Sequence, residues 1–510
     1  MTMDRPAAIA RLRRGPIWDV LVIGGGATGL AAALDAAARG YATALLERGD
    51  FACATSSRST KLVHGGVRYL RQGRTGLVRS ALRERTLLLR NAPALVRSRA
   101  FVVPVYSAWE KLFYGAGLAL YDVLARGHQP ESSRILSCAE TLAVLPTLRP
   151  DRLAGGVRYT DGQFDDAGLA LAFAQAAARH GAAVVNYVPV TALLKAGDRV
   201  AGAVARDEES GETFEVRARA VINATGVFAD EVRRLDEPAT PPTLAPSQGA
   251  HVVLPRDFLP GDTALMIPKT ADGRVLFAIP WHGRVLLGTT DTPVNEVARE
   301  PAPLAEEISY LLEHAGRYLD RTPARADVLS MFAGLRPLVK GRSGPTSALS
   351  RDHLIDVAAS GLVTIAGGKW TTARHMAEDV VDRAAAIAGL PPQPCRTAPL
   401  ALEPALPRRP KLRRTIWSAT PRARPWRERS RTCSPAAPAC FTSTRGPPPP
   451  PLPASRRFWP RNSGGMPAGS RRRSRRSRRS PRGTCREAAG RPGVCRHRSG
   501  PAGLERLKAP

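Results

Sequence analysis

The first 46 residues alternate between apolar runs and a small-residue segment in the manner of a strand–helix–strand unit. Residues 19–23 are a short apolar run rich in β-branched side chains, which is typical of a buried parallel strand. Residues 30–39 are rich in alanine and predict a helix that Gly40 ends, and residues 41–46 predict the next strand. This alternation favours a doubly wound α/β sheet.

The same pattern returns after residue 160. Residues 167–181 predict an Ala-rich helix, and residues 183–187 predict a strand. Residues 200–206 and 213–219 predict a hairpin that leads into the buried strand 220–222. The chain therefore contributes to the first sheet more than once.

Residues 246–292 instead alternate apolar and polar positions between turn residues such as Asp272-Gly273, which predicts an antiparallel sheet. Residues 362–366 predict one more buried strand, after which a helix opens at Gly367-Gly368 and stops at Gly389. The predicted fold class is α/β: a doubly wound Rossmann-like domain, a second antiparallel-sheet domain that covers the substrate, and a disordered C-terminal tail. The predicted limits are 17–100, 150–245 and 330–400 for the first domain, 246–329 for the second, and 404–510 for the tail.

A glycine-rich turn joins the first strand to the first helix. Residues 24–29 read Gly-Gly-Gly-Ala-Thr-Gly and supply the pattern G-x-G-x-x-G. Gly24 allows the tight turn, Gly26 lets a pyrophosphate approach the backbone, and Gly29 lets helix and strand pack closely. Glu47 ends the second strand, where its carboxylate can accept ribose hydroxyls. This order of elements predicts a dinucleotide cofactor at the helix N-terminus but does not separate NAD from FAD.

Residues 53–70 are too polar, and too rich in small residues, for an ordinary helix or strand. They predict a loop around a phosphorylated cofactor, because their hydroxyls can donate to phosphate and ribityl oxygens. Those hydroxyls belong to Thr55, Ser56, Ser57, Ser59 and Thr60.

This stretch resembles the FAD-dependent glycerol-3-phosphate dehydrogenases, within a wider group of flavoproteins similar to glycine oxidase. That family carries I-G-G-G-x-x-G and then C-A-T-S-S-x-S-[ST]-K-L-x-H-G-G-x-R-Y-L, and residues 23–29 and 53–70 match nearly throughout. The resemblance continues to about residue 400, through motifs that include Asn223-Ala224-Thr225-Gly226, Gly334-Leu335-Arg336-Pro337-Leu338 and Gly367-Gly368-Lys369-Trp370-Thr371-Thr372. It implies FAD as cofactor and glycerol 3-phosphate as substrate. It also implies hydride transfer that yields dihydroxyacetone phosphate, with a quinone as electron acceptor.

Oxidation of a phosphorylated alcohol requires an anion site, a base and a flavin. Arginine suits a phosphate because its planar fork pairs two oxygens and stays charged. Arg336 and Arg351 match the family's anion-binding positions, and Arg68 beside Tyr69 belongs to the flavin-side loop.

For proton removal, His251 is the first choice as base and His64 is the second, since imidazole titrates near neutral pH. Lys369 is expected to place positive charge near the flavin and to stabilise its reduced anionic form, and Lys61 is expected to assist from the other side. The full set of predicted cofactor contacts is Gly24, Gly26, Gly29, Glu47, Thr55, Ser56, Ser59, Thr60, Lys61, Gly226, Gly368, Lys369 and Thr371.

Residues 404–510 differ sharply in composition from the rest. They hold 28 Lys and Arg against three Glu, and 19 of the 45 prolines, so the high net charge of +31 belongs mainly to them. They lack helical or strand periodicity and cannot bury enough apolar surface to fold. One interpretation is a disordered basic tail for anionic lipid or nucleic acid.

We favour a shifted reading frame near residue 404. Arg outnumbers Lys 26 to 2 in this stretch, as GC-rich codons read out of frame produce, and its four cysteines lack metal-ligand spacing. The family that the chain resembles continues here with a helical domain. We expect no metal and no nucleic-acid partner.

No apolar segment reaches 18 residues and the N-terminus does not resemble a secretory signal, so we expect a cytoplasmic protein. Residues 109–124 are amphipathic and aromatic, and two interpretations stay open: a helix at a membrane interface, or one that packs on the protein's own core.

Two alternative functions also stay open: a glycerol-3-phosphate, amine or hydroxy-acid oxidase that uses oxygen, or an inactive basic-tailed product that binds anionic partners. The sequence leaves the oligomeric state undetermined.

Overall fold

A computed structural model describes residues 3–14, 17–66, 73, 75–125, 131–340 and 353–403. These residues belong to one compact unit, Met1–Ala419. Four sequence expectations fall outside them: the tail at 404–510, Arg68, Tyr69 and Arg351.

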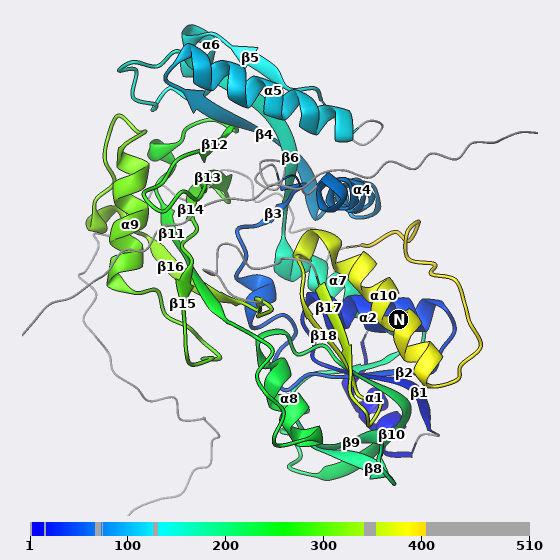
Figure 1. Ribbon diagram of the computed structural model, residues 1–510. Coiled ribbons are helices and arrows are strands. Elements are labelled where there is room, and N and C mark those ends of the chain that lie inside the picture. The colour runs from blue at the N-terminus through cyan, green and yellow to red at the C-terminus, as the bar shows by residue number, and fades with distance from the viewer. Residues whose placement is uncertain are drawn as a thin grey trace, which may run out of the picture. The chain divides into compact units, whose positions relative to one another are not determined.

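Within the described residues, an eight-stranded sheet has a parallel centre (Figure 1). In spatial order its strands are β17 (His353–Val357), β18 (Val363–Gly367), β10 (Thr213–Asn223), β1 (Trp18–Ile23), β2 (Thr43–Leu46) and β7 (Ala183–Val185). β18, β10, β1, β2 and β7 run parallel to one another. β8 (Val190–Ala196) and β9 (Arg199–Arg206) extend β10 as an antiparallel ribbon, as the predicted hairpin requires. The predicted doubly wound sheet is confirmed.

Helices cover both faces of this sheet, which explains why its strands read as continuous apolar runs. Val20 and Val22 of β1 point to one face, where α2 (Ala27–Ala38), α7 (Asp166–Arg179) and α10 (Ala373–Ile387) pack. Leu21 and Ile23 point to the opposite face and contact Ile9 and Leu12 of α1 (Arg5–Arg14). Alanines line much of α2, and their small side chains let it lie against both α7 and α10.

A ten-stranded, mainly antiparallel sheet forms the second part of the unit. Its main path is β15 (Thr292–Pro293), β11 (Ser247–Leu254), β14 (Arg284–Gly288), β13 (Leu276–Trp281), β12 (Ala264–Ile267), β4 (Val96–Val105), β6 (Gly155–Phe164) and β3 (Leu62–Val63). β16 (Ser330–Arg336) pairs with β11, and β5 (Arg134–Leu136) pairs with β6. One face packs on α6 (Cys138–Val144) and α9 (Ala305–Gly316), and the other packs on α4 (Thr75–Asn91) and α5 (Ala108–Leu124). The antiparallel sheet predicted for residues 246–292 is therefore present but is only part of a larger one.

The predicted domain limits do not coincide with these sheet boundaries. β3 and β6 lie within the stretches 17–100 and 150–245, and β4 begins within the first of them, yet all three belong to the second sheet, and so does β16 at the start of 330–400. β4 and β6 pair from Val96 opposite Phe164 to Val105 opposite Gly155. Because the partners are some 50 to 70 residues apart, local periodicity does not reveal the pairing.

The helix predicted to open at Gly367-Gly368 begins later. Gly367 and Gly368 have φ angles of +78° and +76°, outside the helical region, and Lys369 is extended. A short 3₁₀ turn at Trp370–Thr372 follows, and α10 then runs from Ala373. Gly389 ends it with φ of +61°, as predicted.

Shorter elements also lie within the described residues. They are α8 (Ala229–Asp236) and the 3₁₀ turns η1 (Thr55–Ser57), η2 (Gly226–Phe228), η3 (Arg256–Phe258), η4 (Arg325–Asp327) and η6 (Trp370–Thr372).

Candidate cofactor and substrate site

The glycine-rich turn between β1 and α2 brings three backbone segments into contact. A Cβ added to Gly29 would lie 1.9 Å from the carbonyl oxygen of Gly24, and one added to Gly24 would lie 2.7 Å from that of Ala224 at the end of β10. Gly24 also has φ of +109°, which side-chain-bearing residues rarely adopt. No other residue type fits at these two positions.

The start of α2 lacks a cap of its own. Gly26 occupies the N-cap position and offers no side chain, while the Ser56 hydroxyl accepts the backbone N–H of Ala27 at 2.9 Å. A helix start of this kind presents N–H groups and the positive end of the helix dipole to an anion. Ser56 thus contacts the turn itself.

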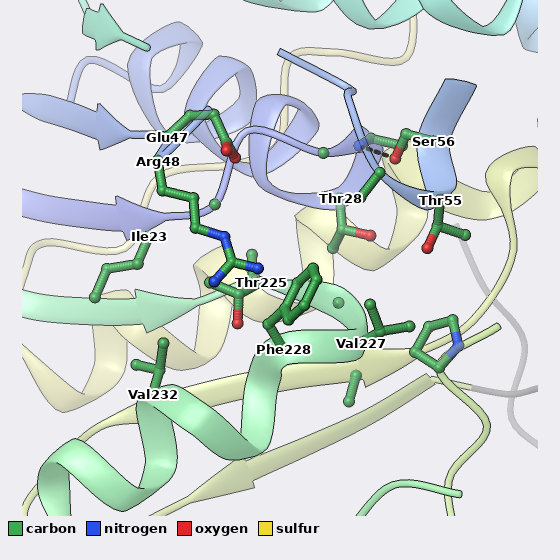
Figure 2. Close-up of a pocket in the computed structure, with 18 of the residues that line it drawn as sticks. Ile23, Thr28, Glu47, Arg48, Thr55, Ser56, Thr225, Val227, Phe228 and Val232 are labelled. Carbon is green, nitrogen blue, oxygen red and sulfur yellow. Dashed lines mark hydrogen bonds between the residues drawn. The ribbon is translucent and has the colours of Figure 1, made fainter. Parts of the chain in front are cut away.

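A cavity of about 410 Å³ opens over this turn (Figure 2). Its lining includes the predicted residues Gly24, Gly26, Glu47, Thr55, Ser56, Gly226, Gly368 and Lys369. The Glu47 carboxylate accepts the backbone N–H groups of Gly25 at 2.6 Å and Gly49 at 2.7 Å, so it shapes the turn and still has acceptor capacity for a ribose.

Arg48 forms another wall of this cavity. Its guanidinium lies over the ring of Phe228, 3.7 Å from the centroid, and Figure 2 shows the two side chains together. It also pairs with Glu231 at 3.2 Å. Sequence reasoning did not select Arg48, although it directly follows Glu47.

A further cavity of about 300 Å³ lies beside the first. Both are lined by Thr55, Pro337, Gly367, Gly368, Lys369 and Trp370. An extended molecule bound at the glycine turn can therefore reach the second cavity along this common wall. FAD fits this arrangement: the turn excludes side chains where a pyrophosphate must approach, and the continuous wall suits an elongated cofactor.

The second cavity is cationic. Four cations, Arg58, Arg274, Arg336 and Lys369, line it against two carboxylates, Asp161 and Asp291. Asp161 is also paired outside the lining, with the fully buried Arg85 at 2.6 Å. Two of the cations also pair outside the lining, Arg58 with Glu300 at 3.4 Å and Arg274 with Asp272. Among the described residues the cations of the lining still outnumber its carboxylates, which favours an anionic ligand.

Arg336 ends β16 and is held firmly at this wall. Its Nη2 donates to the Thr290 carbonyl at 2.8 Å and the Thr289 hydroxyl at 3.2 Å, and its Nη1 lies 3.2 Å from Asp291. Both Nη atoms already contact protein oxygens, so a bidentate phosphate contact of the kind expected requires some of these bonds to be exchanged.

His251 lies in β11 and is 2% exposed. Its Nε2 is 2.9 Å from the Thr60 hydroxyl, and its ring stacks on Phe332 at 4.8 Å between centroids. Burial lowers the pKa of His251 well below its usual range, and the nearby charges of Arg336 and Lys61 lower it further. The imidazole is therefore neutral at physiological pH, as a base must be before it accepts a proton.

His64 and Thr371 meet at the same cavity. The backbone N–H of His64 donates to the Thr371 hydroxyl at 3.1 Å, which ties the loop after β3 to the turn before α10. The His64 ring lies against Phe277, with centroids 6.4 Å apart.

Lys61, predicted as a cofactor contact, makes its contacts away from the two cavities. Lys61 is 6% exposed, lies outside the lining of both cavities, and places Nζ 2.8 Å from both carboxylate oxygens of Asp166. Ser59 donates to the same carboxylate at 2.7 Å. A buried ammonium needs such a partner, so Lys61 anchors the loop to the start of α7. The sequence contains both residues but does not show that they meet.

The remaining hydroxyls of the loop differ in their contacts. Thr55 lines both cavities and donates to the Leu335 carbonyl at 2.6 Å, whereas Ser59 and Thr60 line only the second. The loop therefore lies between the two cavities, as a cofactor-spanning loop must.

Sequence reasoning missed Arg274, Asp291 and Arg58 as site residues. Arg274 follows the turn at Asp272-Gly273, which indicated only a strand end. Its Nη1 lies 3.8 Å from Asp291, so Asp291 sits between Arg274 and Arg336. An arginine directly after a turn and before an antiparallel strand is a weak sequence signal for a binding site. Only the pairing of strands across the sheet shows that Arg274 lies near Asp291.

This fold and site define a class of protein: a flavin-dependent oxidoreductase with a dinucleotide turn beside a cationic substrate cavity. Residues 19–383 match the family model described as FAD dependent oxidoreductase. Over 416 residues the chain is 45% identical to the mitochondrial glycerol-3-phosphate dehydrogenase of Mus musculus, covering 78% of this chain and 57% of that protein.

Solved structures show the same similarity to FAD-dependent enzymes. The glycerol-3-phosphate dehydrogenase of Bacillus halodurans complexed with FAD superposes with a TM-score of 0.64 at 32% identity, covering 78% of this chain and 70% of that one. The L-alpha-glycerophosphate oxidase of Mycoplasma pneumoniae with FAD bound gives 0.56 at 18% identity, covering 75% of this chain and 97% of that one, and shows the fold alone. The chain belongs to the glycerol-3-phosphate dehydrogenase family of FAD-dependent oxidoreductases. It spans 57% of the length of the curated mammalian relatives that it matches.

The glycine turn gives a direct test of the cofactor site. Gly29→Ala should abolish flavin binding, because its Cβ would meet the Gly24 carbonyl at 1.9 Å and force the turn open. Gly117→Ala is the matched control, since a Cβ there meets nothing within 4 Å. Visible flavin absorbance per mole of purified chain measures both; equal flavin content in the two variants would contradict the assignment.

Proposed function

We propose that this chain oxidises sn-glycerol 3-phosphate to dihydroxyacetone phosphate with bound FAD and passes the electrons to a quinone. The observation that carries the proposal is the second cavity, where four cations line a space that continues into the dinucleotide site. The names of the mouse and Bacillus relatives support the same substrate.

The cofactor would lie along residues that fit it. The turn at Gly24, Gly26 and Gly29 and the start of α2 would hold the pyrophosphate, and Glu47 would hold a ribose. Gly226, Gly368, Thr55 and Ser56 line its path. When bound, FAD supplies the hydride acceptor for the reaction.

The substrate phosphate would be held by Arg336, with Arg351, Arg68 and Tyr69 proposed as further contacts from residues outside the described ranges. Arg336 is preorganised by its contacts with Thr290 and Asp291, so little side-chain entropy is lost when the anion binds. Lys369 lines both cavities and would stabilise negative charge that develops at the cofactor.

His251 would accept the proton of the substrate hydroxyl, because its imidazole is neutral and lies in the wall of the cavity. His64 remains the second candidate for this step, since it lines the same cavity.

An anaerobic reduction experiment tests the activity. The purified full chain should carry flavin absorbance that glycerol 3-phosphate bleaches and glycerol does not, because the cationic cavity selects the phosphate. Bleaching by an amino acid such as glycine, with none by glycerol 3-phosphate, would overturn the substrate assignment. Rapid return of the absorbance with air would favour oxygen as acceptor, and return with a soluble quinone would favour the dehydrogenase.

Variants of the two cations should separate binding from chemistry. Arg336→Ala should lower kcat/KM about 100-fold or more, mainly through KM, since it removes charge-assisted bonds to the phosphate. Lys369→Ala should lower the flavin reduction rate at saturating substrate, because it removes charge needed as hydride leaves. Arg317→Ala is the control. Arg317 is half exposed at the C-cap of α9, so the variant should have the kinetic constants of the unaltered chain. Unchanged kinetics in a flavin-loaded variant would refute the role of that residue.

We also propose peripheral contact of the protein with the cytoplasmic face of a membrane, where a quinone acceptor is found. No helix among the described residues is long and apolar enough to cross a bilayer. α5 nevertheless exposes large apolar side chains along one face: Trp109, Leu112, Phe113, Leu120 and Val123. Such a face suits the boundary between headgroups and acyl chains, whereas Leu118 and Tyr121 of the same helix are buried in the core.

Liposome flotation tests this contact. Leu112→Ser with Phe113→Ser should reduce the fraction of protein that floats with vesicles, since burial of each large apolar side chain contributes about 1.5–3 kcal/mol. Leu329→Ser with Met331→Ser, two residues that are also exposed, controls for loss of apolar surface in general. Equal flotation of the two double variants would contradict a role for α5.

A further inference from the structure

Thr60 occupies a position between the substrate cavity and His251. It lines the second cavity, and its hydroxyl lies 2.9 Å from His251 Nε2. A threonine hydroxyl can donate one hydrogen bond while it accepts another. It can therefore pass a proton from a ligand in the cavity to the imidazole of His251. The hydroxyl was expected to contact the cofactor, but the contact that the structure gives it is with His251.

His251 belongs to the lining of the second cavity, but it is only 2% exposed. Its side chain is enclosed on one face by Phe332, with ring planes 15° apart. Across its Cδ2–Nε2 edge lies Gly288, where an added Cβ would be 2.1 Å from Cδ2. Its Nδ1 is buried and has no hydrogen-bond partner among the described residues. The Nε2 contact with Thr60 is therefore the route that leads from the imidazole to the cavity.

We propose that Thr60 contacts the substrate hydroxyl and relays its proton to His251. This inference rests on the proposed function and adds a residue to it. The O–H bond of the substrate breaks and its proton joins Thr60 Oγ1, while the proton that Thr60 carried joins His251 Nε2. The hydrogen on the substrate carbon leaves with its electron pair as the hydride that the proposed oxidation already requires, and the carbon–oxygen bond becomes a carbonyl.

The surrounding charges allow His251 to receive this proton. The ammonium of Lys61 is neutralised by Asp166 at 2.8 Å. The charge of Arg336 faces the cavity in which the substrate phosphate would bind, so a bound dianion offsets its repulsion of an imidazolium. The hydroxyl proton also becomes more acidic as hydride leaves, so a weakly basic imidazole suffices at that moment.

Two substitutions at one position test the relay. Thr60→Val keeps the shape of the side chain and removes the hydroxyl, and Thr60→Ser keeps the hydroxyl and removes the methyl group. Anaerobic flavin reduction by glycerol 3-phosphate should be about 100-fold slower in Thr60→Val, within the range that acid–base groups contribute, and should return to near the original rate in Thr60→Ser. The dissociation constant for dihydroxyacetone phosphate, measured by calorimetry, should stay within about threefold in both, because the oxygen on the reacting carbon of that ligand is a carbonyl and has no proton to transfer.

Equal reduction rates in Thr60→Val and Thr60→Ser would overturn the relay while leaving the proposed function intact. A parallel loss of product affinity and rate in Thr60→Val would show a structural role for Thr60 and would also overturn it. Failure of glycerol 3-phosphate to reduce the unaltered chain would instead refute the proposed function, and the relay with it. If Thr60→Val does not bind flavin, the flavin reduction rate of Thr60→Ala is compared with that of Thr60→Ser instead.

Discussion

The contact between the backbones of Gly29 and Gly24 is the constraint on which the cofactor site depends. A Cβ at Gly29 would lie 1.9 Å from the Gly24 oxygen, and Gly24 in turn lies against Ala224. Through this contact the first turn of α2 sits directly over the ends of β1 and β10. The N–H groups of that turn are thereby aimed at the crevice between β1 and β10, where the strand order of the sheet reverses and where parallel sheets bind their ligands.

The loop at residues 55–64 connects the glycine turn at residues 24–29 to the second sheet. Thr55 bonds to the Leu335 carbonyl in β16, and Ser56 accepts the indole N–H of Trp370 at 2.8 Å through its carbonyl. Lys61 bonds to Asp166 at the start of α7. The loop is therefore fixed to elements of both parts of the unit, at the common wall of the two cavities. The side chains of Thr55, Ser56, Ser59, Thr60 and Lys61 all have hydrogen-bond partners, which explains why the loop is polar although it is not exposed.

The sequence was sufficient for the elements whose physics is local. The glycine turn, the strands that flank it, the Ala-rich helices and the stop at Gly389 follow from periodicity and backbone preference, and all lie within a few residues of their expected bounds. The extent of the second sheet could not be predicted, because β4 pairs on one side with β6 and on the other with β12, which follows it by more than 150 residues. Contacts between residues far apart in the sequence were equally beyond prediction at the site. His251 and Arg336 stood out by motif, but the pairing of Lys61 with Asp166, and of Arg274 with Asp291, exists only in three dimensions.

A carboxylate in the wall of a cationic cavity seems to work against anion binding, yet Asp291 has a clear physical role. It lies 3.2 Å from Arg336 and 3.8 Å from Arg274. Without it, two guanidinium groups would face one cavity with no counter-charge between them, and their repulsion would favour side-chain positions that point away. Asp291 holds Arg336 at the wall, and it shares Arg274 with Asp272, which pairs with the same guanidinium. Asp161 is matched by Arg85, and Arg58 and Arg274 have their own carboxylate partners, so Arg336 and Lys369 carry most of the positive charge that the cavity offers to a phosphate monoester.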